Sequence, residues 1–255
     1  MNDRYTIESK SPLGLLIIPA FNEEGSIGIV LEEASHYWPK ENIIVVNDGS
    51  SDQTSRIVIQ HGIREIKHPT NLGYGVALQT GILFAERKGY DFVITLDADG
   101  QHDPRYLDNL VQALYKTGSH LIIGSRLSQL GGHKDTPHAR RIGMGFFFWV
   151  TKMITGQKLV DTTSGFKIIH SLLFPEIGKT VFIDFHAELL IYFSLKGYKI
   201  GQIPVMMRQR NTGNSLHNWT SAFSYPAKTI LGILIAIADI LVYKMHSRAR
   251  DTSLL

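Results

Sequence analysis

The sequence contains no cysteine, which excludes a disulfide framework and a thiolate metal site. It also lacks a dense stripe of Lys and Arg with interleaved aromatic residues, so we expect no nucleic-acid partner. Residues 1–10 are polar and charged and do not resemble a signal peptide. No apolar stretch reaches the roughly 20 residues that span a bilayer, and the closest, residues 230–243, is interrupted by Asp239. These absences predict a cytoplasmic protein that is soluble or peripheral to a membrane.

The chain has 255 residues, enough for one sizeable α/β domain, and no Pro/Gly/Ser-rich linker divides its first two-thirds. Apolar runs alternate with stretches of helical spacing, which predicts a mainly parallel sheet flanked by helices. We expect a main domain over residues 1–221 and an apolar helix with a basic tail over residues 222–255. Helices are expected near residues 27–38, 51–60, 73–88, 104–114, 142–155, 185–196 and 222–244, and later strands near 64–67, 121–123 and 198–208.

Three early apolar runs each end in a polar cluster. The runs cover residues 13–18, 43–46 and 92–96. Short continuous apolar runs are typical of buried parallel strands, whose carboxyl ends meet at one edge of the sheet, where ligands bind. Asp97 and Asp99 follow the third run, and two carboxylates there suit a hard divalent cation, Mg²⁺ or Mn²⁺, that also holds substrate phosphates. An Asp-x-Asp pair is also frequent in turns, so the prediction depends on the other two strand ends.

The polar clusters continue along the chain in a recognisable order. They cover residues 19–24, 47–52, 71–75, 97–104, 124–126, 161–167, 185–188 and 210–215. In these segments the chain resembles a family 2 glycosyltransferase with the GT-A fold, in the branch of dolichyl- and polyprenyl-phosphate sugar transferases. The resemblance spans residues 13–217 and implies an enzyme that transfers a sugar from a nucleotide diphosphate. One departure is Leu216, where relatives often carry Lys, which bears on contacts to the donor phosphates.

The resemblance implies a donor site with a bound cation. Asp99 is expected to be the direct metal ligand, and Asp97 to share the ligation or contact the ribose. Gln101 matches a further ligand position, with a helix-capping role as its equal alternative. The donor is expected to be a UDP-sugar rather than a GDP-sugar. The residues expected to line the nucleotide pocket are Pro19, Ala20, Phe21, Asn22, Glu23, Asp48, Asn71, Gly73, Tyr74, Asp97 and Ala98.

For the acceptor, the resemblance implies a polyprenyl phosphate. Because this phosphate is already an anion, it needs positioning cations more than a general base. The arginines at matching positions are Arg126, Arg140 or Arg141, and Arg210, and the acceptor loop carries Asp161, Thr163 and Ser164. The alternative acceptor is a hydroxyl of a cell-surface glycan, for which Glu188 or Asp184 would be the base. Glu188 could instead be a helix residue held by a salt bridge. A catalytically inactive nucleotide-sugar-binding module is the third possibility.

Two apolar segments bear on where the acceptor is reached. Residues 142–154 are rich in aromatic side chains and follow the basic pair Arg140 and Arg141. Residues 230–243 are almost continuously apolar, and basic residues follow them. Basic residues beside an apolar helix are typical of attachment to a membrane surface, here the inner face of the cell membrane. The alternatives are a core helix and the interface of a homo-oligomer.

Overall fold

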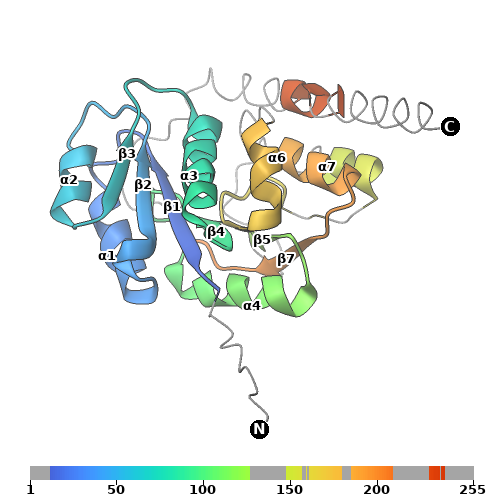
Figure 1. The fold of residues 1–255 in the computed structure, drawn as a ribbon, viewed down its shortest axis with the longest axis horizontal. Coiled ribbons are helices and arrows are strands. Elements are labelled where there is room, and N and C mark those ends of the chain that lie inside the picture. The colour runs from blue at the N-terminus through green and yellow to red at the C-terminus, as the bar shows by residue number, and fades with distance from the viewer. Residues whose placement is uncertain are drawn as a thin grey trace, which may run out of the picture.

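The computed structural model describes residues 12–126, 148–156, 159, 161–179, 185–208, 230–235 and 237–238. Within them lies one seven-stranded sheet with the strand order β3-β2-β1-β4-β6-β5-β7 (Figure 1). The strands are β1 (Gly14–Ala20), β2 (Ile43–Asn47), β3 (Arg64–Lys67), β4 (Phe92–Thr95), β5 (Leu121–Ser125), β6 (Lys167–His170) and β7 (Ile200–Pro204). β6 runs antiparallel to β4 and β5, and the other four strand pairs are parallel. The expected mainly parallel α/β sheet is confirmed.

Helices cover both faces of this sheet, as Figure 1 shows for α3 on one side of β1–β3 and α1 and α2 on the other. Alternate residues of β1 serve the two layers, because successive side chains of a strand point to opposite faces. Leu15 and Ile17 pack with α3, α6 and α7, whereas Leu16 and Ile18 pack with α1, α2 and α4. The helices are α1 (Ile27–Tyr37), α2 (Thr54–Gln60), α3 (Tyr74–Lys88), α4 (Leu107–Thr117), α6 (Phe174–Lys179) and α7 (Ala187–Leu195), with short 3₁₀ turns η1 (Lys40–Asn42), η2 (Pro104–Tyr106) and η4 (Ser171–Leu173).

β1 extends two residues beyond the expected strand, through Pro19 to Ala20. A proline, which has no amide proton to donate, is tolerated in this central strand because the hydrogen bonds between β1 and β4 end before it. The Ile17 carbonyl accepts a hydrogen bond from the Leu96 amide, so Ile17 faces β4, and Pro19 faces the same side two residues later. The last register pair with β4 is Ile17 with Thr95, so no β4 partner lacks a donor at Pro19.

β6 is the strand that the sequence did not predict, because residues 161–167 were expected to form a loop. It pairs with β4 in the register Thr95–Lys167 and with β5 in the register Ile123–Lys167. The strand expected over residues 198–208 is shorter, since β7 covers Ile200–Pro204. By inserting between β4 and β5, β6 carries the preceding residues 161–166 to the carboxyl ends of β4 and β5.

Two further helical segments pack on α7. Ala187 and Ile191 of α7 form a small buried cluster with Ile233, against which Val150 and Ile154 also pack. Residues 230–235 lie beside α7 in Figure 1, at the red end of the colour scale. The helices expected over residues 142–155 and 222–244 are described only over 148–155 and 230–238 without residue 236, and the expected boundary at residue 221 lies outside the described residues. Within the described residues, no helix is both long and apolar enough to cross a membrane.

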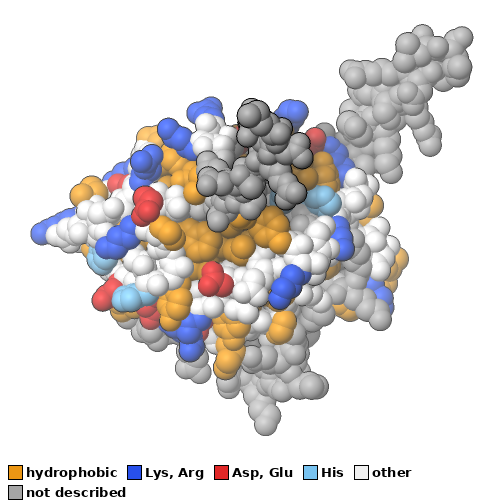
Figure 2. All heavy atoms as spheres, turned by 60° about the horizontal axis from the view of Figure 1, so that its bottom comes forward, with side chains coloured by type: hydrophobic (Ala, Val, Ile, Leu, Met, Phe, Trp, Pro, Cys, Tyr) orange, Lys and Arg blue, Asp and Glu red, His pale blue; other side chains and the backbone are white. Residues whose placement is uncertain are grey.

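The surface near α4 carries charges of both signs. On the face shown in Figure 2, basic and acidic side chains are interspersed around a hydrophobic area. The described residues of this face therefore form no continuous band of positive charge.

Candidate functional site

The carboxyl ends of β1, β2 and β4 meet at one edge of the sheet, as the sequence predicted. The Ala20 carbonyl accepts a hydrogen bond from the Asp48 amide (2.8 Å), and the Ile17 carbonyl accepts one from the Leu96 amide (3.0 Å). Asp97 and Asp99 follow directly after this last contact. The sheet therefore brings the two predicted metal carboxylates beside the loops that follow β1 and β2.

Three neighbours surround the Asp97 carboxylate. The Tyr74 hydroxyl donates a hydrogen bond to Oδ1 (2.9 Å), and His102 Nε2 lies 3.5 Å from Oδ2. The Asp97 amide donates to His102 Nδ1 (3.0 Å), so the ring proton of His102 is on Nε2 and faces the carboxylate. Burial lowers the pKa of His102, which keeps the ring neutral at physiological pH against the opposing charges of Asp97 and Asp99. The third neighbour is the backbone of Gly165.

Gly165 allows this close approach because it has no Cβ. A Cβ at this position would lie 2.5 Å from Asp97 Oδ2 and 2.7 Å from Oδ1. Thr95, at the end of β4, fixes the glycine by donating a hydrogen bond to the Gly165 carbonyl (2.5 Å). The loop before β6, expected to bind the acceptor, is thereby in contact with the carboxylate expected to bind the donor.

We expect the substitution Gly165→Ala to displace the Asp97 carboxylate and lower turnover by about a hundredfold, because misplacing a reacting group by about 1 Å costs that much. The free energy of unfolding should fall by only about 1–3 kcal/mol, as for other overpacked sites. A matched control is Gly28→Ala in α1, where the nearest atom to the new Cβ is Ile57 Cγ2 at 3.4 Å. Steady-state rates and urea unfolding of both variants test this, and normal turnover of the Gly165 variant would contradict it.

Asp99 and Gln101 lie one turn further along the same loop. The Gln101 amide donates a hydrogen bond to Asp99 Oδ1 (3.0 Å). The capping role considered for Gln101 belongs to Asp103, which accepts a hydrogen bond from the Arg105 amide (3.0 Å) at the start of η2. That alternative for Gln101 was wrong, because the chain places the cap two residues later, directly before Pro104.

The donor set at this edge fits a magnesium or manganese ion. Asp97 and Asp99 are both partly exposed. Their carboxylate oxygens are the type of ligand that a hard divalent cation prefers. Within the described residues, no group of three or more His, Cys, Asp or Glu side chains could hold a metal by itself. Such a set of one or two carboxylates, completed by substrate phosphates and water, is typical of Mg²⁺ sites.

Asp48 lies at the expected edge, but its carboxylate bonds the protein's own loop. It is buried and accepts hydrogen bonds from the amides of Leu72 (2.9 Å) and Gly73 (2.8 Å), and His68 Nδ1 lies 2.7 Å away. Residues 71–73 are thus fixed at the start of α3, where Gly73 adopts a φ of 101°. A contact of Asp48 with the base or ribose stays a prediction, while its bonds to this loop explain the shape of the pocket wall.

The loops after β1 and β2 are joined by hydrogen bonds. Asn22, with a φ of 53°, donates from its amide to Ser50 Oγ (3.0 Å) and accepts from the Ser51 amide through Oδ1 (2.9 Å). The Glu23 amide donates to Thr54 Oγ1 (2.9 Å). The remaining predicted pocket residues differ in exposure: Ala20 and Ala98 are buried, Phe21 and Tyr74 are partly exposed, and Asn71 is exposed.

Arg126 and Asp161 form an ion pair that the sequence did not predict. Arg126 Nε lies 2.7 Å from Asp161 Oδ2, and its Nη2 donates to Asp161 Oδ1 (2.9 Å) and to Thr163 Oγ1 (2.7 Å). The Asp161 side chain is 0% exposed and that of Arg126 is 20% exposed. Burial alone would raise the pKa of Asp161, but the hydrogen bonds and charge of Arg126 hold it below its usual value.

Lys167 is the site residue that the sequence reasoning missed. Its side chain is 1% exposed, and its ammonium donates a hydrogen bond to the Ser164 carbonyl. Burial lowers the pKa of Lys167 to about 8, although the negative charges of Asp97, Asp161 and Glu188 oppose this shift. A buried lysine requires such compensation. The available sequence signal was a charged residue at the start of an apolar run after a Ser-Gly pair.

Glu188 lies in the first turn of α7 and is fully buried. A Cβ on Gly232 would come within 3.3 Å of its Cγ, so residues 230–235 cover this side chain closely. Of the remaining predicted residues, Ser164 is buried, and its Oγ accepts a hydrogen bond from the Phe166 amide (3.2 Å). Arg140, Arg141, Asp184 and Arg210 lie outside the described residues.

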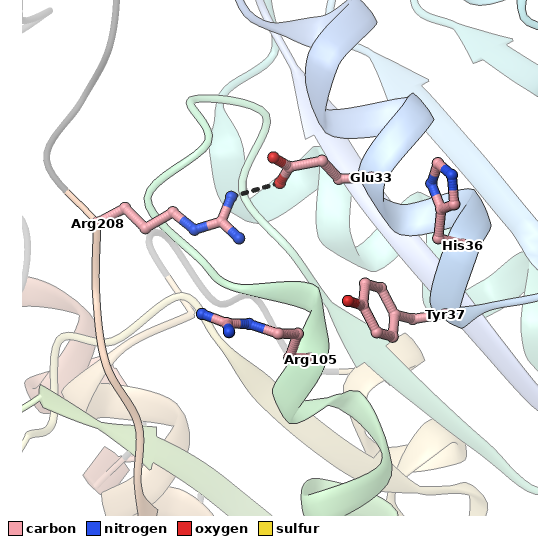
Figure 3. Close-up of a pocket in the computed structure, with 5 residues that line it drawn as sticks. All are labelled: Glu33, His36, Tyr37, Arg105 and Arg208. Atoms are coloured by element: carbon pink, nitrogen blue, oxygen red, sulfur yellow. Dashed lines mark hydrogen bonds and ion pairs between the residues drawn. The ribbon is translucent and has the colours of Figure 1, made fainter.

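A polar pocket lies beside the loop of Asp97 and Asp99, on the side of α1 (Figure 3). Its lining residues are Glu33, His36, Tyr37, Arg105 and Arg208. Arg208 binds Glu33 (2.5 Å) and Asp103 (3.2 Å), and its amide donates to the Gln101 carbonyl (2.9 Å). The guanidinium groups of Arg105 and Arg208 already pair with carboxylates. These ion pairs stabilise the loop of Asp97 and Asp99 on the side that faces α1.

Comparisons with known proteins agree with this geometry. Residues 15–177 match the model of the family described as Glycosyl transferase family 2. The dolichyl-phosphate hexose transferase of Haloferax volcanii is 30% identical over 195 residues, which cover 76% of this chain and 82% of that protein. The UDP-N-acetylglucosamine–dolichyl-phosphate N-acetylglucosaminyltransferase of Methanococcus voltae is 28% identical over 210 residues, covering 74% and 83%.

Among solved structures, the chain is similar to glucosyl-3-phosphoglycerate synthase from Mycobacterium tuberculosis, crystallised with Mn²⁺, UDP-glucose and phosphoglyceric acid. The TM-score is 0.69 at 19% identity, and the likeness covers 89% of this chain and 80% of that one. At this identity the likeness shows the fold alone, which is the expected GT-A fold.

Proposed function

The chain belongs to glycosyl transferase family 2, and from this premise we propose that it transfers a sugar, with inversion, from a UDP-sugar to a polyprenyl phosphate. The observation that carries the proposal is the contact between Gly165 and Asp97, which joins the expected acceptor loop to the expected metal carboxylate. The names of the two relatives, both dolichyl-phosphate sugar transferases, support the acceptor class. The UDP-N-acetylglucosamine in one of these names supports the donor class.

In the proposed reaction, an oxygen of the lipid phosphate forms a bond to the anomeric carbon of the sugar. The bond from that carbon to the diphosphate breaks, and UDP leaves with the electron pair. No proton has to be removed from the acceptor, because its phosphate is ionised at neutral pH. The protein's task is therefore to position two anions next to each other and to offset their charge.

The residues divide this task between the two substrates. Asp99 and Asp97, with Gln101 as a further ligand, would hold Mg²⁺ or Mn²⁺, which when bound neutralises charge on the diphosphate leaving group. Arg126 would bind the lipid phosphate, because its side chain is 20% exposed whereas its partner Asp161 is fully buried. Without the metal ion and Arg126, the carboxylates of Asp97 and Asp99 would repel the negatively charged acceptor phosphate.

The buried position of Glu188 disfavours the alternative in which this residue removes a proton from a glycan hydroxyl. The deciding experiment incubates the purified protein with Mn²⁺ and labelled UDP-glucose or UDP-N-acetylglucosamine, and offers undecaprenyl phosphate or a saccharide as acceptor. We expect label in the lipid fraction. Transfer to the saccharide alone, or to neither acceptor from either donor, would contradict the proposal.

A lipid acceptor must be reached at a bilayer, and an apolar surface lies beside the site. We define the apolar face as the exposed side chains of Trp149 and Met153 together with those of Ile230, Leu231, Leu234 and Ile235. Both helical segments pack on α7, whose first turn carries Glu188. We therefore propose that residues 222–255 and the apolar face lie on the inner face of the cell membrane, while residues 1–221 form the catalytic domain.

Replacing Leu231 and Leu234, which are 53% and 58% exposed, with serine should weaken binding to phosphatidylglycerol vesicles by about tenfold for each leucine, because each loses roughly 1.5 kcal/mol of apolar burial. Vesicle sedimentation measures this. The matched control is the double serine substitution at Ile29 on α1 and Ile59 on α2, which are 52% and 66% exposed. Unchanged vesicle binding with loss of a dimer in light scattering would assign the face to a homo-oligomer instead.

A further inference from the structure

Tyr74, at the start of α3, contacts both sides of the candidate site. Its hydroxyl donates a hydrogen bond to Asp97 Oδ1 (2.9 Å), which places it against the expected metal carboxylate. Its ring stacks on the ring of His186, with centroids 5.7 Å apart and an interplanar angle of 26°. His186 precedes α7 and lies two residues before Glu188. Tyr74 therefore joins the end of β4 to the start of α7.

Asp48 fixes the backbone that leads into Tyr74. The Asp48 carboxylate holds the amides of Leu72 and Gly73, the two residues that lead into Tyr74. His68 lies between Asp48 and α3, with its Nε2 3.0 Å from Thr80 Oγ1. With this anchor on one side and the His186 ring on the other, the phenol has little freedom to turn its hydroxyl away from Asp97.

The His186 ring is held by its own local structure. Phe185, directly before it, is buried and adopts a φ of 57°, in the left-handed region that residues other than glycine and asparagine rarely occupy. Burial lowers the pKa of His186 well below its usual value, and the charges of Lys167 and Arg126 act in the same direction. A neutral, constrained ring is a firm stacking partner for Tyr74.

We propose that Tyr74 is a positioning residue that holds the Asp97 carboxylate in the orientation in which it receives a divalent cation. The inference rests on the proposed function, because it takes Asp97 as a metal ligand. Tyr74 was expected to line the nucleotide pocket, whereas this role acts through Asp97 and requires no contact with the nucleotide. Groups that hydrogen-bond to metal-binding carboxylates fix their orientation, and their removal typically costs 10- to 100-fold in metal affinity.

The Asp97 carboxylate has several neighbours, and the charge of Lys167 also acts on it, but the contact with Tyr74 is the short and directional one. Gly165 closes one side by contact, and His102 lies at a long 3.5 Å from Oδ2. Only the Tyr74 hydroxyl makes a short hydrogen bond to Oδ1 among the contacts described above. If the hydroxyl is removed, we expect the carboxylate to rotate towards His102 and away from a cation shared with Asp99.

The test measures metal binding directly. Free Mn²⁺ is followed by electron paramagnetic resonance while it is titrated into the full chain in the presence of saturating UDP. We expect Tyr74→Phe, which keeps the ring and its stacking on His186, to bind Mn²⁺ roughly 10- to 100-fold more weakly than the unaltered protein. The matched control is Tyr90→Phe, because the Tyr90 hydroxyl donates to Asn42 Oδ1 (3.1 Å) away from the site.

The outcomes separate this inference from the function on which it rests. Equal Mn²⁺ affinity of the unaltered protein and the Tyr74→Phe variant would overturn the role of Tyr74. An equal loss in the Tyr74 and Tyr90 variants would overturn it too, because a general effect on the fold would then explain the loss. An unaltered protein that binds no Mn²⁺ with UDP would instead contradict the metal site of the proposed function.

Discussion

Replacing Asp99 with asparagine is expected to lower turnover by about a thousandfold. The substitution keeps the size of the side chain but removes one of the two carboxylates at the end of β4. Metal stabilisation of the leaving diphosphate contributes several kcal/mol, and a loss of about 4 kcal/mol corresponds to roughly three powers of ten in rate. Transfer of labelled sugar to undecaprenyl phosphate over a range of Mn²⁺ concentrations measures the effect.

The fold should tolerate this change. Asparagine Oδ1 can still accept the hydrogen bond that the Gln101 amide donates to Asp99 (3.0 Å). The free energy of unfolding without metal should stay the same or rise, because the variant relieves repulsion with Asp97. Asp108→Asn, an exposed position in the first turn of α4, is the matched control and should leave turnover unchanged. Near-normal, metal-dependent turnover of the Asp99 variant would show that another residue holds the cation.

The sequence was most informative where local pattern and burial coincide. β1, β2 and β4 are buried on both faces, so each reads as a continuous apolar run. Polar residues follow the runs of β2 and β4 directly, whereas β1 continues two residues past its run. Parallel strands place their carboxyl ends at one edge, which is why Asp48 and Asp97 could be assigned to one site. The helices α1 and α3 were predictable for a similar reason, from apolar residues at helical spacing.

β6 was not predicted because it depends on contacts with residues that are distant in the sequence. The strand has four residues and starts with Lys167, which in isolation is a residue of a solvated loop. The lysine is buried only because Asp97, Asp161 and Glu188, distant in the sequence, offset its charge. No pattern within residues 161–170 contains that information.

The sequence also did not predict which residues of the site bind each other. Arg126 was expected to bind the acceptor phosphate and Asp161 to lie in the acceptor loop, but 35 residues separate them and nothing local indicates that they bind each other. Asp48 shows the same limit, because its bonds to Leu72 and Gly73 depend on how the loop before α3 folds back. Sequence pattern identified which residues gather, and the three-dimensional contacts determine which of them remain available to substrates.

The pairing changes what is expected of Arg126→Ala. If Arg126 only bound the acceptor phosphate, its loss would lower turnover and leave the free energy of unfolding unaltered. The substitution also removes the bidentate partner of the buried Asp161 carboxylate. Breaking a buried pair in this way costs about 3–5 kcal/mol. We therefore expect a lower free energy of unfolding at pH 7 in urea titrations, together with a loss of transfer of at least about a hundredfold.

The double variant Arg126→Ala, Asp161→Asn separates the two effects. Asparagine removes the stranded charge, so most of the lost stability should return at pH 7, while transfer stays low because the cation is still missing. Full stability with restored transfer would contradict the role of Arg126 in phosphate binding. A double variant as unstable as Arg126→Ala would show that the stranded charge is not the cause of the instability.

The pH dependence provides an independent check on the same pair. In the unaltered protein the pKa of Asp161 is lowered, so its stabilising effect is fully present above the unfolded value of about 3.9 and is lost as the pH falls through the folded pKa. In Arg126→Ala, burial dominates and raises the pKa of Asp161, so the folded state takes up a proton as the pH falls and no longer holds a buried charge. The difference in unfolding free energy between the two proteins should therefore narrow between pH 7 and pH 4.5. A difference that stays constant over this range would mean that Asp161 is not the group whose charge Arg126 offsets.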